Sequence, residues 1–548
     1  MPGRPATRLP GAADVPGGAQ RALWLTASLW LAVVVVALAV RPPLPVDETR
    51  YLAVAWDMWL EGHYLVPYLN GETYSHKPPL LFWLMTAGWH LFGVNDWWPR
   101  LVAPLFGLGC LMLTLRLADA LWPGRRVSET APVLLFGALF WTLFSTLTMF
   151  DMLLAFFALW ALLGLLRAAR GEGLSGFIVA GVALGFGVLA KGPAILLHVL
   201  PVALAAPWWA PGIRRGRWYG GTVLAVALAV VIGLAWAIPA GLAGGAVYRE
   251  AIFWGQSANR VVDSFAHARP FWWYAAVLPG LVLPWLVWPP LWRGFRRLRW
   301  AMDEAGVRIC LVWFGTAFVV FSLISGKQLH YLLPEFPALA LLAARAIADG
   351  EEDVGPRDAW LPGGLAIVIG ALLLAAPWLL ISGSTGELLS EAQPAWGVLV
   401  IAAGVLALLH GNPDPGAQTG RLASISVFAV LALHLAAAPI LASRYDLAPM
   451  ARDLASLQES GKQIAYFGKY HGQFHFLGRM KLPIAEIGLE EGDDAAFLAA
   501  HPDGVVVARY RNVPDAAVPL LTYPFRSYTY VVWPVAAMRA HPGLGNRR

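Results

Sequence analysis

The sequence predicts a mostly α-helical, polytopic membrane protein with a small α/β domain at its C-terminal end. Of the 548 residues, 58% are hydrophobic and only 14% are charged. Long apolar runs alternate with short arginine clusters, which is the pattern of helices that cross a bilayer and are joined by cytoplasmic loops. The formal charge of +6 does not indicate a nucleic-acid partner, because the basic residues form no continuous stripe.

About thirteen membrane spans are expected when the loops rich in Lys and Arg are placed on the cytoplasmic side. Residues 23–40 form the first span and run outward, and the membrane module occupies residues 22–442. Arginines mark successive inner turns at residues 125–126, 167–170, 214–217 and 293–299. The odd number of spans places the C-terminal end of the chain on the outer side.

The N-terminal tail and the first outer loop differ in composition. Residues 1–21 are rich in Gly, Pro and Ala and are expected to be disordered. Residues 41–97 are polar and aromatic, and stretches 48–60 and 79–92 are expected to be helices that lie in the membrane interface. This loop therefore brings polar side chains next to the bilayer on its outer side.

Two polar clusters lie in this first outer loop, where charge close to hydrocarbon is costly and usually functional. The clusters comprise Asp47, Glu48, Arg50 and Tyr51, and then Tyr74, His76 and Lys77. Asp47 and Arg50 could form only an i,i+3 ion pair at a helix start, and Lys77 could be a lysine that extends to the interface. Alternatively, the carboxylate acts as a general base, and the two cations stabilise a phosphate leaving group.

Other polar residues fall at the outer ends of later spans. They are Asp151, Lys191, Lys327, His330 and Tyr331. Asp151 is the one charged residue between positions 131 and 166, so it belongs at the outer tip of a helical hairpin; a simpler interpretation is a helix cap. Lys191 could be an interfacial anchor. The outer loop at residues 241–270 is long enough to cover a cavity, or it could merely connect two spans.

From residue 443 onward the pattern changes to that of a soluble domain, which occupies residues 443–548. Residues 448–460 have the spacing of an amphipathic helix, and residues 463–467, 504–510 and 528–534 are expected to be strands. The sequence therefore predicts a small α/β domain on the outer side of the membrane.

No metal or cofactor site is predicted, and whether a divalent cation is required stays open. His471 and His475 are four residues apart, but Gly472 and the neighbouring aromatic residues argue against a metal-binding helix. The sequence contains no Walker loop or dinucleotide fingerprint. An outward-facing site with acidic and basic groups beside the bilayer instead suits a reaction on a lipid-linked sugar phosphate.

These motifs, taken in order, resemble those of the polyprenyl-phosphate-sugar-dependent glycosyltransferases of the GT-C class, and within it the aminoarabinose transferases of lipid A. The resemblance covers about residues 22–350 and rests on residues 47–51, 77–79, 150–152, 191–192, 268–274 and 326–334. It implies that Asp47 is the principal catalytic carboxylate and Asp151 the second, and that the donor is bound by Arg50, Tyr51, Tyr74, Lys77 and Tyr331. Glu48, His76, Lys191, Lys327 and His330 join the substrate-binding set by their place on the same outer face.

The resemblance implies an inverting glycosyltransferase of the bacterial inner membrane, with its active site and C-terminal domain in the periplasm. It would move a sugar such as 4-amino-4-deoxy-L-arabinose from a polyprenyl phosphate to an envelope acceptor such as lipid A phosphate. His76 and residues 255–261 depart from the family's pattern, so transfer to protein or to another glycan is the nearest alternative. A lipid-linked-substrate transporter or flippase is a further alternative, but transporters place polar groups near the midplane rather than at one boundary.

Overall fold

The computed structural model describes residues 17–255, 268–350, 354–378, 386, 390–409 and 415–545. Within these residues it contains nine helices long and apolar enough to cross a membrane, together with three shorter apolar helices. The predicted class, a mostly helical multi-pass protein, is therefore confirmed, whereas the total of about thirteen spans stays a prediction. Most of the tail predicted at residues 1–21 lies outside the described residues, and the first helix already begins at Gly17.

The first outer loop contains the two helices that the sequence predicts. The elements in order are α1 (Gly17–Val40), α2 (Asp47–Glu61), β1 (Tyr68–Leu69), β2 (Glu72–Thr73), α3 (Leu80–Phe92) and α4 (Trp97–Leu121). Helix α2 begins with two acidic residues, which suit the positive N-terminal end of a helix dipole. It ends at Gly62, whose φ of 71° is accessible to glycine without strain. Helix α3 packs against both α2 and α4.

The helices that follow form the middle of the bundle. They are α5 (Val127–Phe136), α6 (Leu139–Phe144), α7 (Phe150–Arg167), α8 (Leu174–Lys191), α9 (Ile195–Leu204), α10 (Ala206–Trp209), α11 (Arg215–Ala243) and α12 (Gly245–Glu250). A Cβ added to Gly181 would lie 2.8 Å from the carbonyl oxygen of Ala225, and one on Gly185 would lie 2.6 Å from Ile232. Helices α8 and α11 therefore run parallel at close range, so the chain must return between them through α9.

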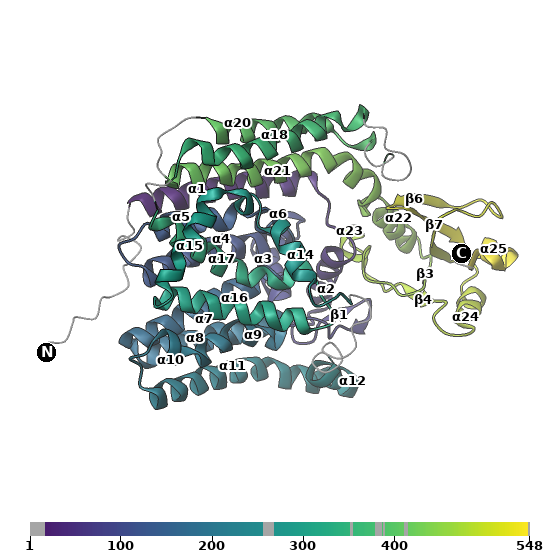
Figure 1. The fold of residues 1–548 in the computed structure, drawn as a ribbon. Coiled ribbons are helices and arrows are strands. Elements are labelled where there is room, and N and C mark those ends of the chain that lie inside the picture. The colour runs from purple at the N-terminus through teal and green to yellow at the C-terminus, as the bar shows by residue number, and fades with distance from the viewer. Residues whose placement is uncertain are drawn as a thin grey trace.

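The second half of the bundle completes the membrane module. It consists of α14 (Trp273–Leu281), α15 (Pro289–Leu298), α16 (Ala305–Leu323), the 3-10 helix η8 (Leu329–Glu335), α17 (Phe336–Ala348), α18 (Trp360–Ala375), α20 (Gly397–Leu408) and α21 (Pro415–Arg444). Figure 1 shows α18, α20 and α21 along one edge of the bundle and α8 and α11 along the opposite edge. The C-terminal domain lies at one end of the bundle, beyond α2, while α10 and α15 lie toward the other end.

The C-terminal domain is built on a five-stranded sheet. Its elements are α22 (Ala448–Glu459), β3 (Ile464–Phe467), α23 (His475–Gly478), β4 (Ala485–Ile487), α24 (Asp493–Ala500), β5 (Val505–Tyr510), β6 (Leu521–Phe525), β7 (Tyr528–Pro534) and α25 (Val535–Ala540). The strand order is β4-β3-β5-β7-β6, with parallel pairs around β3 and antiparallel pairs around β7. The three predicted strands match β3, β5 and β7, whereas the edge strands β4 and β6 were not predicted.

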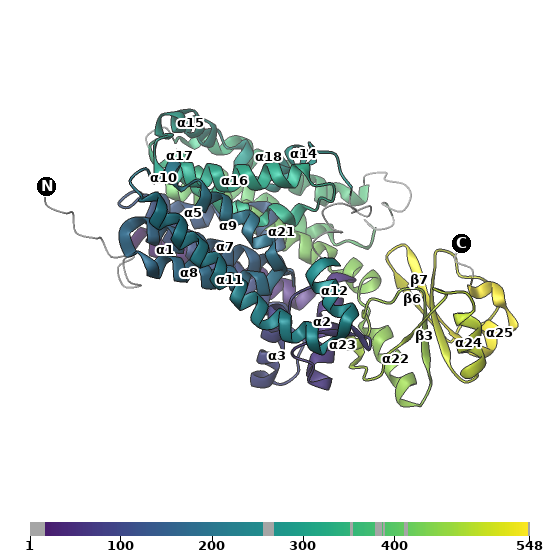
Figure 2. The same ribbon diagram turned by 90° about the horizontal axis from the view of Figure 1, so that it is seen from below.

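The C-terminal domain is attached to the first outer loop by specific hydrogen bonds. Asn70 donates to the carbonyl oxygen of Ile484 at 2.9 Å and accepts from its backbone N–H at 2.8 Å. The indole of Trp56 in α2 donates to the carbonyl oxygen of Met480 at 2.8 Å. Figure 2 shows α22 and α23 facing the α2 side of the bundle, with the sheet beyond them. The domain is thereby fixed next to the start of α2.

Candidate active site

Asp47 is the first residue of α2, at the end of the bundle that adjoins the C-terminal domain. Its carboxylate forms an ion pair with Arg50, one turn further along the helix, and the Tyr51 hydroxyl lies 3.5 Å from it. The Asp47 side chain is 52% exposed. The simpler interpretation of this motif, an i,i+3 ion pair at a helix start, is therefore observed, but the carboxylate stays accessible to a substrate.

Glu48 differs from the neighbouring Asp47, because its side chain is buried and both of its carboxylate oxygens contact other groups of the protein. Its carboxylate is ion-paired with Arg41, and it accepts backbone N–H bonds from Leu44 and Thr148 at 2.7 Å each. Burial alone would raise the pKa of Glu48, but the Arg41 guanidinium and the two backbone donors lower it overall. Glu48 thereby fixes α2 against the segment before α7, and its predicted contact with substrate stays a prediction.

Asp151 lies in the first turn of α7, where its carboxylate is buried. It accepts a hydrogen bond at 2.5 Å from the ammonium of Lys191, the last residue of α8. The N-cap residue of α7 is Met149, so Asp151 does not act as the helix cap that the simpler interpretation proposed. Lys191 is likewise more than an interfacial anchor, because its ammonium is held between Asp151 and the ring of Tyr331, whose centre is 5.3 Å away.

Aromatic rings join the start of α2 to the start of α7. Tyr51 meets Phe150 edge-on with ring centres 4.9 Å apart, and Phe82 of α3 contacts both rings. The Lys77 ammonium lies 6.0 Å from the centre of the Phe150 ring. Burial raises the pKa of Tyr51 well above its usual range, and the charges of Asp47 and Asp151 add to this effect. Tyr51 therefore lies within electrostatic reach of both aspartates, as the predicted shared chamber requires.

The η8 helix brings further predicted residues to the same place. The His330 ring lies at a tilt against Phe144 and meets Tyr331 edge-on, with ring centres 5.5 and 5.1 Å away. It interacts electrostatically with Asp151, Lys191, Asp47 and Lys77. Groups from α2, the α2–α3 segment, α7, α8 and η8 thus converge at one end of the bundle, which is the geometry that the sequence predicts.

Lys327 precedes η8, and its side chain forms hydrogen bonds with backbone oxygens. Its ammonium donates to the carbonyl oxygen of Arg269 at 3.0 Å and also to that of Ile324. A single antiparallel bridge between Ala268 and Gly326 holds the same two segments together. The observed task of Lys327 is to tie these segments, and its predicted contact with substrate stays a prediction.

Two other predicted residues lie on the α2–α3 segment. Tyr74 is buried, with its ring centre 6.2 Å from that of Phe82 and 5.3 Å from that of His76, which is itself exposed. Tyr74 therefore belongs to the aromatic wall of the site, and His76 faces outward from it. Residues 256–267 of the predicted covering loop lie outside the described residues, and these include residues 256–261 of the stretch that departs from the family pattern.

Sequence analysis missed some residues that support the site. Arg41 looks like an ordinary charge at the end of a span, yet it is buried and paired with Glu48. His198 and Glu335 contact each other and are both buried, on α9 and at the end of η8. A histidine and a glutamate inside apolar helices are a detectable signal, but their pairing depends on the three-dimensional fold. Among the described residues, no group of three or more His, Cys, Asp or Glu side chains is placed to hold a metal ion.

Comparison with known proteins gives related sequences. Residues 76–236 match the family described as dolichyl-phosphate-mannose-protein mannosyltransferase. The undecaprenyl phosphate-alpha-4-amino-4-deoxy-L-arabinose arabinosyl transferase of Edwardsiella ictaluri (strain 93-146) is 31% identical over 408 residues, which cover 70% of this chain and 71% of that protein. Transferase 2 of the same description from Pseudomonas fluorescens (strain Pf0-1) is 30% identical over 337 residues. The chain spans 60% of the length of that relative.

A solved structure shares the fold over nearly the whole chain. The crystal structure of ArnT from Cupriavidus metallidurans bound to undecaprenyl phosphate superposes with a TM-score of 0.72 and 21% sequence identity. The match covers 93% of this chain and 97% of that one. The membrane module and the C-terminal domain therefore follow one known architecture.

Proposed function

This chain belongs to the family of undecaprenyl phosphate-4-amino-4-deoxy-L-arabinose arabinosyl transferases, and we propose that it is a membrane glycosyltransferase of that specificity. Its donor is a polyprenyl phosphate that carries the sugar, and its acceptor is a phosphorylated envelope lipid such as lipid A. The observation that supports this most directly is the convergence of Asp47, Lys77, Asp151 and Lys191 at one end of an apolar helical bundle. The reaction takes place on the periplasmic side of the bacterial inner membrane.

The donor phosphate is bound by lysine side chains. Lys191 and Lys77 both interact electrostatically with Asp151, so their ammonium groups lie close enough to act on one phosphate. Asp151 orients Lys191 through the 2.5 Å hydrogen bond. Because these cations are partly shielded from water, they stabilise the negative charge of the leaving phosphate more strongly than they would in bulk solvent.

The lipid tail of the donor lies among the helices. An apolar cavity of about 360 Å³ is lined by residues of α5, α14, α15 and α17, including Leu135, Leu278 and Phe336. Phe336 contacts Phe140, and the ring of Phe144 links Phe140 to His330 of the site. The cavity is therefore near enough to the polar cluster to take an isoprenoid chain whose phosphate is bound there.

The chemical step is a single displacement at the anomeric carbon. An oxygen of the acceptor attacks that carbon, the bond from the carbon to the phosphate oxygen breaks, and its electron pair leaves with the polyprenyl phosphate. One displacement inverts the configuration at this carbon. Asp47 orients the acceptor and takes its proton when the nucleophile is a hydroxyl; a phosphate oxygen needs only the orientation.

The test uses the purified chain in lipid nanodiscs with a polyprenyl-phosphate aminoarabinose donor and lipid A, with the product detected by mass spectrometry. Asp47→Asn is expected to lower turnover by about 10²-fold, because an acceptor phosphate that Asp47 no longer orients is misplaced for attack on the anomeric carbon. The matched control is Glu61→Gln, which removes an exposed carboxylate from the other end of α2. Turnover at the wild-type rate in a folded Asp47→Asn sample would contradict the proposal.

A second candidate function follows from the match of residues 76–236 to the protein mannosyltransferase family. In that case the lipid-linked sugar would be a hexose and the acceptor a protein. Mass spectrometry of lipid A and of envelope proteins, from cells with and without this chain, separates the two. An aminoarabinose increment on lipid A that depends on the chain supports the main proposal, and a hexose on protein supports the second.

A further inference from the structure

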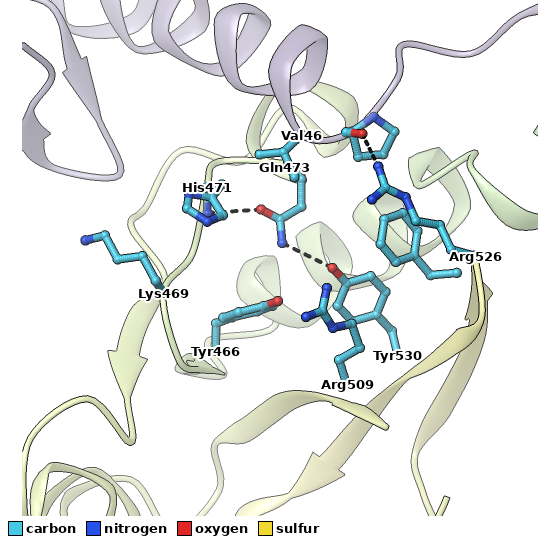
Figure 3. A pocket seen from close by; sticks show the side chains of 10 residues that line it. Val46, Tyr466, Lys469, His471, Gln473, Arg509, Arg526 and Tyr530 are labelled. Atoms are coloured by element: carbon cyan, nitrogen blue, oxygen red, sulfur yellow. Dashed lines mark hydrogen bonds between the residues drawn. The ribbon is translucent and has the colours of Figure 1, made fainter. Parts of the chain in front are cut away.

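A polar pocket of about 180 Å³ lies between the C-terminal domain and the start of α2. Figure 3 shows its lining side chains, which come from the sheet, from the loop after β3 and from the segment before α2. The lining residues are Pro45, Val46, Tyr466, Lys469, His471, Gln473, Arg509, Phe525, Arg526 and Tyr530. The volume is far above the roughly 10–15 Å³ that one water needs, so the pocket has room for a small polar group.

The floor of the pocket is a buried set of hydrogen-bonding groups. Tyr466, Gln473 and Tyr530 are only 6%, 4% and 2% exposed. Gln473 accepts a hydrogen bond from the backbone N–H of His471 at 3.1 Å and donates to the Tyr530 hydroxyl at 3.5 Å. These contacts hold the amide in one orientation, as Figure 3 shows. Buried side chains that are held in this way form a preorganised surface for a ligand.

Three cations surround this floor. Lys469, Arg509 and Arg526 lie on the exposed side of the pocket, and none of the described residues that line the pocket is acidic. Lys469 is balanced by Glu486 at 3.0 Å. In the part of the chain that the structure describes, neither arginine is ion-paired with a carboxylate, and each lies instead over an aromatic ring. Guanidinium groups around a cavity are the groups that recognise phosphate.

The pocket adjoins the proposed active site. Val46 lines it and directly precedes Asp47. Arg526 donates at 2.5 Å to the carbonyl oxygen of Pro45, so the cationic side of the pocket is tied to the chain that enters α2. His471 interacts electrostatically with both Arg50 and Asp47. A molecule held in the pocket is therefore next to the carboxylate that acts on the acceptor.

We propose that this pocket binds a phosphate group of the acceptor, away from the oxygen that is glycosylated, and thereby positions the acceptor at Asp47. The proposal rests on the proposed function for the identity of the acceptor. The same chemistry could be offered by the headgroup of an anionic phospholipid. An acceptor phosphate is favoured because the pocket borders the residue that the acceptor must reach, and because its floor belongs to the C-terminal domain rather than to the helical bundle.

The kinetic test is a charge-neutralising pair, Lys469→Gln with Arg509→Gln, in the full-length protein in nanodiscs. The matched control is Lys481→Gln with Arg511→Gln, which removes two exposed cations of the same domain that do not line the pocket. The pocket variant is expected to raise KM for the phosphorylated acceptor by about tenfold, the usual effect of losing charge-assisted hydrogen bonds. Its kcat is expected to stay within about twofold of the wild type. An unchanged KM overturns the proposal.

A binding test without donor separates this proposal from the proposed function. The probe is a water-soluble phosphorylated glucosamine disaccharide, compared by calorimetry with its dephosphorylated counterpart. Wild-type protein is expected to prefer the phosphorylated form by about tenfold, and the pocket variant is expected to lose that preference. If transfer activity is absent but the pocket variant loses the preference, phosphate binding is supported and the proposed function fails. If nanodiscs rich in phosphatidylglycerol abolish the preference, the pocket binds a lipid headgroup and the acceptor role is overturned.

Discussion

Lys191 donates a hydrogen bond to Asp151 across 2.5 Å, and this ion pair joins the end of α8 to the first turn of α7. The Asp151 side chain is 2% exposed and that of Lys191 is 15% exposed. A carboxylate this deeply buried depends on its cation, because desolvation is costly for an unpaired charge. The pair therefore fixes the start of α7 to the end of α8 and holds the Lys191 ammonium at the Tyr331 ring.

Breaking this pair should separate stability from activity. Lys191→Met is expected to destabilise the protein by about 3–5 kcal/mol, because it leaves a buried carboxylate without its partner. Combining it with Asp151→Asn should restore most of the stability, since no buried charge remains, while transfer stays lost. Thermal unfolding in detergent and the transfer assay measure the two effects. A double variant that transfers sugar would rule out the role of Lys191 in binding the donor phosphate.

Lys77 should contribute to binding of the donor rather than to the stability of the fold. Lys77→Met is expected to raise KM for the polyprenyl-phosphate sugar by about tenfold, because it removes a charge-assisted contact to phosphate. Its thermal stability should change little, since the side chain is only partly buried. Lys481→Met, an exposed lysine of the C-terminal domain, is the control. Equal donor KM values for the two variants would contradict the phosphate contact.

Glu48 should be essential for folding of the site. Glu48→Gln replaces an oxygen with an amide N–H₂ that would face Arg41 or a backbone N–H donor, either of Leu44 or of Thr148. A loss of about 3–5 kcal/mol is expected, because the buried Arg41 loses its counter-charge. Glu61→Gln, on the exposed end of the same helix, should unfold like the wild type. The thermal unfolding midpoints of the two variants are compared in detergent. Equal midpoints would show that the contacts of Glu48 with Arg41, Leu44 and Thr148 are not needed for stability.

The C-terminal domain should lose stability in acid because of His475. Burial lowers the pKa of this histidine from 6.5 to about 4. Above pH 6.5 the folded and unfolded forms are both neutral, but between pH 6.5 and 4 only the unfolded form gains a proton, so stability falls across that window. The loss is roughly 3 kcal/mol for a shift of this size, with no further loss from this group below pH 4.

Hydrogen exchange of β3 and β5 in the full-length protein, corrected for the intrinsic pH dependence, measures this effect. A glutamine at the same position, His475→Gln, can keep a hydrogen bond to Tyr470, which lies 2.8 Å from the histidine ring. This variant should show a flatter pH profile whatever its absolute stability. A profile as steep as that of the wild type would assign the acid sensitivity to another group.

The sequence was a reliable guide where a local pattern determines the outcome. Helices α2 and α3 begin and end within one residue of the predicted positions, and strands β3, β5 and β7 are short, mostly buried apolar runs that the sequence also places correctly. Asp47 and Asp151 both lie near Tyr51, at the same end of the bundle, as the arginine clusters predict. Strands β4 and β6 were missed because the first has three residues and the second contains Pro524 at the edge of the sheet.

Which charged side chains form ion pairs with each other could not be predicted in the same way. The sequence indicates the i,i+3 pair of Asp47 and Arg50, but it does not say that Lys191 pairs with Asp151. Nor does it separate Glu48 from its neighbour, although one is buried and the other is half-exposed. Such pairings depend on which helix ends meet, and that is decided by packing over the whole bundle.

The two hydrogen bonds between Asn70 and Ile484 have a consequence for acceptor choice. One asparagine side chain satisfies both backbone groups of a residue beside β4, so the domain cannot slide along the first outer loop without losing both bonds. The distance from Arg509 to the Asp47 carboxylate is then fixed. Under the roles proposed for the pocket and for Asp47, the enzyme is expected to discriminate among acceptors by the distance between the bound anion and the atom that receives the sugar.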